Sequence, residues 1–182
     1  MTQAQTPPAA PETKCCAHHG AFAILHDCHE HILERLARLE GLGHELQRAS
    51  ALEERHLALL GDVLSFLHTA IPMHSADEER TLFPRLRAAQ PTLGRTPMDC
   101  LEREHVDHGA QLATLERTIV QRDPAAIARA ALAVVASYRE HIGKEEEILF
   151  PWARELLADP AIVQAMTREM RERRVAAGLL SC

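Results

Sequence analysis

Aromatic side chains are scarce in this chain of 182 residues, where Phe, Trp and Tyr together make up 3%. β-Branched residues are also few, and these two groups are the ones that favour strands. Ala, Leu, Arg and Glu dominate instead, and such a composition favours helix. We therefore predict a helical fold, and the length suits one domain with its own core.

Several signals of targeting and of macromolecular partners are also missing. The N-terminus has no apolar segment of the secretory kind, and no apolar run approaches the roughly 20 residues of a membrane span. The net charge is −6 without a block of Lys and Arg, which argues against nucleic acid. The cysteines show no disulfide spacing pattern: Cys15, Cys16, Cys28, Cys100 and Cys182. We expect a cytoplasmic protein that binds neither membranes nor nucleic acid.

Residues 1–17 are rich in Pro, Ala and Thr, which predicts a disordered N-terminal tail. The segment from Cys15 to His19 is dense in sulfur and imidazole, which could bind a metal or carry redox chemistry. Its adjacent cysteines lack the C-x2-C spacing of a zinc site, so a tail without metal is the favoured interpretation.

Four apolar stripes at helical spacing follow the tail, starting near Gly20, near Ser50, at Met98 and after Pro124. The connections between them are short, which predicts an all-α, antiparallel up-down-up-down four-helix bundle. A capping residue followed by proline opens the last two stripes and a short fifth helix, at Thr96-Pro97, Asp123-Pro124 and Asp159-Pro160. We expect the bundle to span residues 18–158 and an accessory helix to occupy 159–182, where it packs on the bundle or forms a homodimer contact.

Three residues should disturb the first two helices. Gly41 and Gly43 predict an end or a bend in the first helix, because glycine weakens a helix interior. Pro72 lies inside the second stripe and predicts a kink just before His74.

Histidine is the most over-represented residue, at 12 of 182. Each stripe carries one histidine at a central core position, and two stripes add a glutamate four residues later. Burying an ionisable side chain costs on the order of several kcal/mol unless the side chain pairs with another group or binds a metal. The residues concerned are His29, His74, Glu78, His105, His141 and Glu145.

The two H-x3-E sequences belong to an internal repeat, H-S-A-D-E-E-R-T-L-F-P from His74 and H-I-G-K-E-E-E-I-L-F-P from His141. Positions i and i+4 share one helix face, so each histidine and its glutamate can reach the same ion. Four imidazoles and two carboxylates suit a metal such as iron, and two shared glutamates suggest a pair of ions. Structural zinc sites favour cysteine, and Mg²⁺ and Ca²⁺ favour more oxygen ligands.

These motifs, together with D-C-H-E-H-I-L from Asp27 and E-H-V-D-H from Glu104, resemble the hemerythrin-like (HHE cation-binding) family over roughly residues 20–157. The resemblance implies two non-haem Fe ions, bridged by oxo or hydroxo, inside a four-helix bundle. It implies that the glutamates bridge the irons and the histidines bind terminally, through His29, His74, Glu78, His105, His141 and Glu145.

One position departs from the oxygen carriers of that family, which have H-x3-H in the third helix. Gly109 stands four residues after His105, so one histidine is missing. The pattern is therefore more similar to the bacterial iron-centre-repair proteins, and the Cys15-Cys16 pair is also similar to a pair near the N-terminus of that group.

Three choices between neighbouring residues stay open in the sequence: His26 or His29, His105 or His108, and Glu145 or Glu146. We prefer His29, because of the apolar residues that follow it, and His105, because of the E-H pair. His26, His108, Glu79 and Glu146 are then candidates to hydrogen-bond the ligand imidazoles or move protons. Tyr138 lies one turn before His141 and is either a plain core aromatic, which we favour, or a donor to a bound oxygen species.

The leading functional hypothesis is a non-haem di-iron protein that binds or reacts with a small oxidant, namely O2, NO or peroxide. Oxidative or nitrosative stress and iron handling are the settings that fit such a centre. The alternative is an iron- or oxygen-responsive sensor without turnover, in which metal occupancy orders part of the chain and changes a partner contact.

Overall fold

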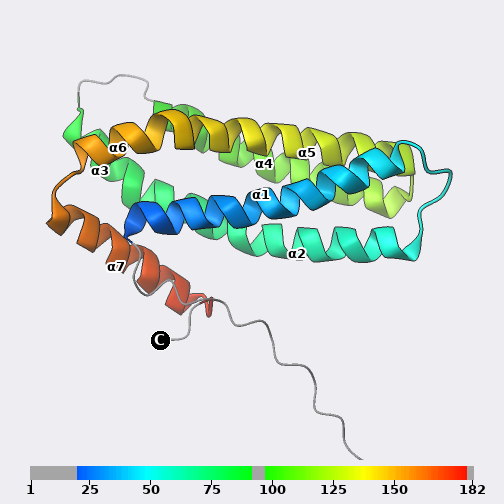
Figure 1. Ribbon diagram of the computed structural model, residues 1–182, viewed down its shortest axis with the longest axis horizontal. Coiled ribbons are helices and arrows are strands. Elements are labelled where there is room, and N and C mark those ends of the chain that lie inside the picture. Colours follow the sequence, from blue (N-terminus) through cyan, green and yellow to red (C-terminus); the bar gives the residue numbers. More distant parts are fainter. Residues whose placement is uncertain (1–19, 92–96, 180–182) are drawn as a thin grey trace, which may run out of the picture.

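The computed structural model describes residues 20–91 and 97–179, and it is entirely helical over those residues (Figure 1). The helices form five continuous rods, two of which contain a π-helical turn between two α-helices. The rods are α1 (Ala21–Leu46), then α2 (Glu54–Asp77) with η1 (Glu78–Leu82) and α3 (Phe83–Ala89), α4 (Pro97–Gln121), α5 (Pro124–Lys144) with η2 (Glu145–Leu149) and α6 (Phe150–Leu156), and α7 (Pro160–Ala176).

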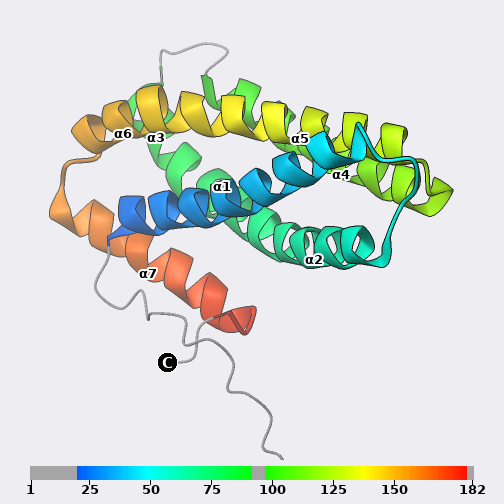
Figure 2. The same cartoon turned by 45° about the vertical axis from the view of Figure 1, so that its right-hand side comes forward.

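The first four rods form the predicted bundle, and α7 crosses one end of it (Figures 1 and 2). α1 packs against both α2 and α5, and α5 also packs against α4. α2 and α4 contact each other much less closely, so one side of the bundle is more open than the others. The predicted all-α bundle with an additional C-terminal helix is confirmed.

Two of the three predicted helix starts show the expected cap. The Asp123 carboxylate accepts hydrogen bonds from the backbone N–H groups of Ala125 and Ala126, at 2.9 and 3.2 Å. Asp159 accepts from the N–H of Ala161 at 2.8 Å. Thr96 lies outside the described residues, although Pro97 is the first residue of α4 as expected.

The first helix does not end at its glycines, which rules out one of the two predicted alternatives, an end or a bend. α1 continues through Gly41 and Gly43 to Leu46. A Cβ atom at position 43 would lie 2.9 Å from Cγ of Leu132 on α5, closer than real side chains approach. Gly43 therefore allows α1 and α5 to pack closely, which is a reason for glycine that the sequence alone does not reveal. α2 likewise continues through Pro72 to Asp77.

The π-turns correct the prediction for the end of the fourth helix. An uninterrupted helical period would place Ile148 on the core stripe with His141 and Glu145, yet it is 67% exposed, whereas Leu149 and Phe150 are buried. A π-turn adds one residue to a helical turn, so every later side chain shifts around the axis. The cause lies in the prolines: Pro84 and Pro151 have no N–H for the carbonyl four residues earlier, and each stands two residues after the last residue of a π-turn.

Two apolar clusters fill the bundle, one on each side of the histidine layer. The larger lies toward the α1–α2 connection and includes Ile32, Leu67 and Leu112. The smaller contains Leu25, Phe83, Phe150 and both buried methionines of α7. In each of the four long rods, the predicted metal-binding residues come between a residue of one cluster and a residue of the other.

The continuous rod Glu54–Ala89 is long and apolar enough to cross a membrane, with a mean hydropathy of 1.3 over its most apolar window. Core helices of water-soluble bundles meet the same criterion, and this rod carries buried His74, Asp77 and Glu78. The expected lack of membrane binding stays a prediction.

α7 packs on the bundle through a buried ion-pair group next to η1. The Asp77 carboxylate, which is 0% exposed, accepts hydrogen bonds from Arg173 and Arg174 of α7. Arg173 also donates to the Thr81 hydroxyl at 3.0 Å, and Arg85 pairs with Glu169. The C-terminal helix is thus an accessory element of the bundle, as one of the two sequence-based alternatives proposed.

Replacing both arginines, Arg173→Met and Arg174→Met, should lower the free energy of unfolding by about 3 kcal/mol, because a buried carboxylate then loses its cations. Urea unfolding followed by circular dichroism measures this change. Arg168→Met, on the exposed side of the same helix, is the matched control and should change stability by less than about 0.5 kcal/mol. Equal effects of the two changes would show that Asp77 does not hold α7 in place.

Candidate metal centre

All six predicted metal-binding residues meet in one layer at the middle of the bundle. They come from every one of the four long rods, and all are buried except His105, which is nearly so. They form two groups of four, in each of which one ligand atom per residue lies within 4.8 Å of the others. The groups are His29, His74, Glu78 and Glu145, and Glu78, His105, His141 and Glu145.

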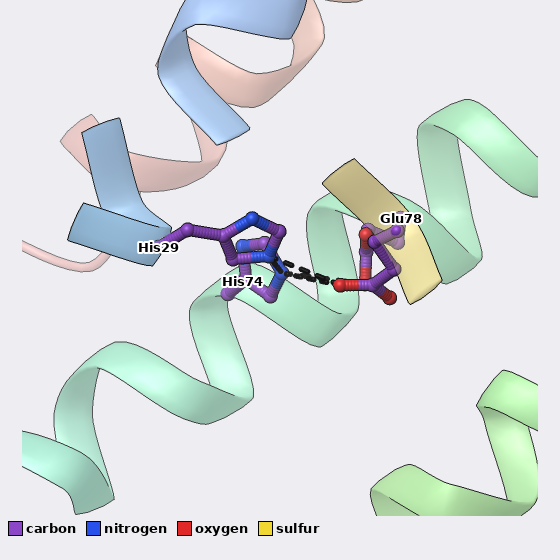
Figure 3. Close-up of side chains that lie close together, drawn as sticks. His29, His74 and Glu78 are labelled. Carbon is purple, nitrogen blue, oxygen red and sulfur yellow. Dashed lines mark hydrogen bonds and ion pairs between the residues drawn. The ribbon is translucent and has the colours of Figure 1, made fainter. Parts of the chain in front are cut away.

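The two glutamates belong to both groups, and their oxygen atoms face both pairs of histidines. Glu145 places Oε2 3.0 Å from Nε2 of His29 and Oε1 3.0 Å from Nε2 of His141. Oε2 of Glu78 lies 3.4 Å from Nε2 of both His74 and His105. Figure 3 shows His29 and His74 converging on Glu78. Carboxylates shared in this way suit two neighbouring metal ions.

The histidine rings point their Nε2 atoms at each other in pairs. Nε2 of His29 lies 2.8 Å from that of His74, and Nε2 of His105 lies 3.1 Å from that of His141. The four carboxylate oxygens of Glu78 and Glu145 are buried without a hydrogen bond. Such converging, unsatisfied lone pairs are costly in a protein interior, and a cation between them would remove that cost. The residues therefore fit a pair of metal ions.

The pKa values of the two carboxyl groups are driven in opposite directions. Burial and the charge of Glu145 raise the pKa of Glu78 well above its ordinary value. Burial would also raise the pKa of Glu145, but contacts with His141, His29 and His74 outweigh it and hold that pKa well below the ordinary value. The two carboxyl groups thus differ in how strongly each holds a proton, and a metal ion at Glu78 should compete with protonation of that group.

Two of the histidines differ in the same way. Burial lowers the pKa of His74 to about 4, so its imidazole is neutral and free to bind a cation. Burial also opposes the charged form of His141, but hydrogen bonds and charge from Glu145 and Glu104 raise its pKa above the ordinary value. A metal ion at His141 must therefore displace a proton as well.

Three carboxylates outside the two groups fix the orientation of three histidines. Nδ1 of His29 lies 2.7 Å from Glu146, Nδ1 of His105 lies 2.7 Å from Glu79, and Nδ1 of His141 lies 2.8 Å from Glu104. A hydrogen bond at Nδ1 holds the ring with Nε2 toward the metal and raises its basicity. Glu79 and Glu146 thus lie where one sequence-based alternative placed them, beside the rings and not on a solvated flank.

Sequence reasoning missed the corresponding role of Glu104. It used this residue only as half of the E-H pair that identified His105. The contact crosses from α4 to α5, and Lys144 binds the second oxygen of Glu104 at 2.7 Å. The sequence did contain a signal for such a role. Glu79 and Glu146 each follow a predicted bridging glutamate and were candidates to hydrogen-bond a histidine ring, so a carboxylate partner could be expected for a third ring as well. The pairing itself could be found only in the packed structure.

The structure brings His29, His105 and Glu145 into the two groups and leaves their neighbours outside. His26 is half exposed and lies 3.0 Å from Glu146 at the surface. His108 is buried one turn beyond His105, with Nε2 3.1 Å from the hydroxyl of Ser137. That the six residues bind metal stays a prediction, because distances alone do not test it.

A search of protein families and known proteins adds independent information. The hemerythrin HHE cation binding domain matches residues 20–153. The iron-sulfur cluster repair protein YtfE of Dickeya chrysanthemi (strain Ech1591) is 32% identical over 102 residues, 52% of this chain and 46% of that protein. The protein of the same name from Musicola paradisiaca (strain Ech703) is 28% identical over 138 residues, 71% of this chain and 62% of that protein.

The chain therefore spans roughly half to three-fifths of the length of these curated relatives. No solved structure gave a significant match. The family match includes all four long rods and all six residues of the centre. The chain belongs to the hemerythrin HHE cation-binding domain family.

Proposed function

We propose that this chain holds a non-haem di-iron centre that binds or reacts with a small oxidant, O2, NO or peroxide. The observation that carries the proposal is the pair of buried His/Glu groups that share Glu78 and Glu145. His29 and His74 would hold one ion and His105 and His141 the other. Iron supplies reversible electron transfer and open positions for such ligands.

The donor set favours iron over the common alternatives. Each group offers two imidazoles and two carboxylates and no thiolate, whereas structural zinc sites are rich in cysteine. Mg²⁺ and Ca²⁺ prefer oxygen ligands throughout. The relatives are named iron-sulfur cluster repair proteins, which also supports iron and favours a role of this chain in iron handling or stress.

A groove between α2 and α4 offers a way to the centre from solvent. Its volume is about 500 Å³, and its lining includes His105, Glu79 and Gly109. A Cβ atom at Gly109 would meet nothing within 4 Å, so the missing histidine leaves open space beside His105. A groove that is open to solvent favours a protein that reacts with a small ligand over one that only stores oxygen in an enclosed pocket.

A sensor without turnover is the second candidate, favoured by one contact. Asp77, which binds the two arginines of α7, directly precedes Glu78 of the metal centre. Metal at Glu78 would stabilise η1, and η1 carries much of the surface on which α7 packs. Loss of metal would then weaken the packing of α7 and change the surface that is available to a partner protein.

The remaining expectations are part of the same proposal. We propose a cytoplasmic protein whose partner is a small diatomic ligand or peroxide, with neither a nucleic acid nor a membrane involved. A homodimer is compatible with this proposal, and its test is the molar mass in solution.

Protein purified without oxygen and reconstituted with Fe²⁺ should contain about two irons per chain, since the two groups of ligands are complete. Exposure to air should then produce near-ultraviolet charge-transfer bands of a bridged di-iron(III) centre. Metal analysis and an absorption spectrum, with and without NO, measure both. A stoichiometry near zero after reconstitution would refute the di-iron proposal.

Substituting His74→Ala or Glu145→Ala should abolish these bands and reduce the bound iron, because each change removes a donor from the centre of the layer. His44→Ala is the matched control: His44 is exposed on α1 and hydrogen-bonds Gln47, outside both groups of ligands. Its bands and iron content should equal those of the wild type. His56 is a poorer control, since it is buried and caps α2 with Glu53.

Limited proteolysis separates the two candidate functions. A sensor should show at least tenfold slower cleavage within 160–179 when iron is bound, because metal at Glu78 fixes η1 under α7. A di-iron protein that acts by turnover should consume peroxide or NO catalytically and show equal cleavage in both states. Protection combined with no turnover would contradict the leading proposal and favour the sensor.

A further inference from the structure

A small internal cavity lies between the metal centre and the larger apolar cluster. Its volume is about 10 Å³, which is roughly the minimum that one water molecule needs. All four imidazoles of the metal centre line it. Ile32, Ile71 and Ile142 form apolar walls. A ligand on either metal ion would therefore extend into a confined and largely apolar space.

Two further side chains line this cavity and carry polar atoms without partners. The Tyr138 hydroxyl and Nδ1 of His108 are both buried and make no hydrogen bond to any described residue. The two rings stack with centroids 3.8 Å apart, and His108 also packs edge-on against the ring of His141, at 4.8 Å. Apolar cores seldom leave two adjacent polar groups unsatisfied, so their position against the cavity indicates a missing polar partner.

The contacts of Ser137 decide which nitrogen of His108 carries the proton. The Ser137 hydroxyl accepts a hydrogen bond from the Gln111 amide at 3.2 Å and lies 3.1 Å from Nε2 of His108. The backbone carbonyl of Ser137 is a further partner of His108 on this side, so Nε2 carries the proton and donates. Nδ1 of the neutral imidazole is then an acceptor, and the Tyr138 hydroxyl is the donor at the cavity without a described acceptor.

We propose that the Tyr138 hydroxyl is a recognition site for the outer atom of a ligand of two or three heavy atoms that accepts a hydrogen bond. The inference rests on the proposed function, since the inner atom would be held at the metal centre. It adds a specificity: ligands with an acceptor at the outer end, such as azide or peroxide, are favoured over ligands without one. A buried donor that gains an acceptor recovers the cost of its burial, which gives this preference its physical basis.

Azide is the probe, because it is small, anionic and accepts hydrogen bonds at its outer nitrogen. The iron-loaded full chain is titrated with azide in air and followed by absorption, and the antisymmetric stretch of bound azide is recorded in H2O and D2O. Tyr138→Phe should weaken azide binding about tenfold while the iron content stays at the wild-type value. The stretch should shift between H2O and D2O in the wild type and shift less in Tyr138→Phe.

Two further variants separate hydrogen bonding from cavity shape. Ile142→Val changes the wall of the same cavity without a polar atom and should leave azide affinity within about twofold. Ser137→Ala lies outside the cavity and removes a partner of His108 while leaving the Tyr138 hydroxyl in place, so it should also leave azide affinity within about twofold. If Tyr138→Phe does not fold, as judged by circular dichroism, the H2O/D2O shift of bound azide in the wild type carries the test, and its absence would overturn the hydrogen bond.

Three results would overturn the proposal. Equal azide affinity and an equal isotope shift in Tyr138→Phe and wild type would show that Tyr138 does not hydrogen-bond azide, and the di-iron proposal would stand. A tenfold loss in Ile142→Val would assign the effect to cavity shape. A wild-type protein that binds no iron would refute the proposed function, and the cavity proposal with it.

Discussion

The burial of two carboxylates and four imidazoles in one layer is the constraint on which the rest of the structure depends. Glu78 and Glu145 have no exposed surface and no hydrogen-bond donor to either of their oxygens. Neither apolar cluster can offset the cost of burying these carboxylates, because both clusters end at this layer. The bundle is therefore organised as two cores with a cation-binding layer between them, and carboxylates behind three of the rings extend that layer toward the surface.

The two π-turns connect this layer to the chain. Each begins at a glutamate of the centre, and each precedes the proline of an L-F-P sequence. The proline removes one helical hydrogen bond, and the wider turn that results rotates the following residues by about one position. Consequently Leu82, Phe83, Leu149 and Phe150 face the smaller core immediately beyond the glutamates. One local feature thus places a predicted metal-binding residue and the packing residues that follow it.

The open and closed sides of the layer serve different purposes. On the side of α1 and α5 the helices pack closely, with Gly43 against Leu132. Between α2 and α4 the groove at Gly109 reaches His105. The small cavity is confined, and the Tyr138 hydroxyl on its lining is a donor without a described partner. Under the proposed function, the groove would admit a ligand, and the cavity would limit its size and polarity.

The sequence by itself determined the helical class, the caps at Asp123 and Asp159, and the set of residues that meet in the central layer. It could do so because helical periodicity is local, and because buried ionisable residues on four apolar stripes are stabilised mainly by contact with one another. Only the tertiary structure decided the exposure of Ile148, the close approach at Gly43, the partner of Glu104 and the cavity beside Tyr138. Each of these depends on contacts between helices far apart in the chain or on a shift of one residue in register, and neither is encoded in the period of a single helix.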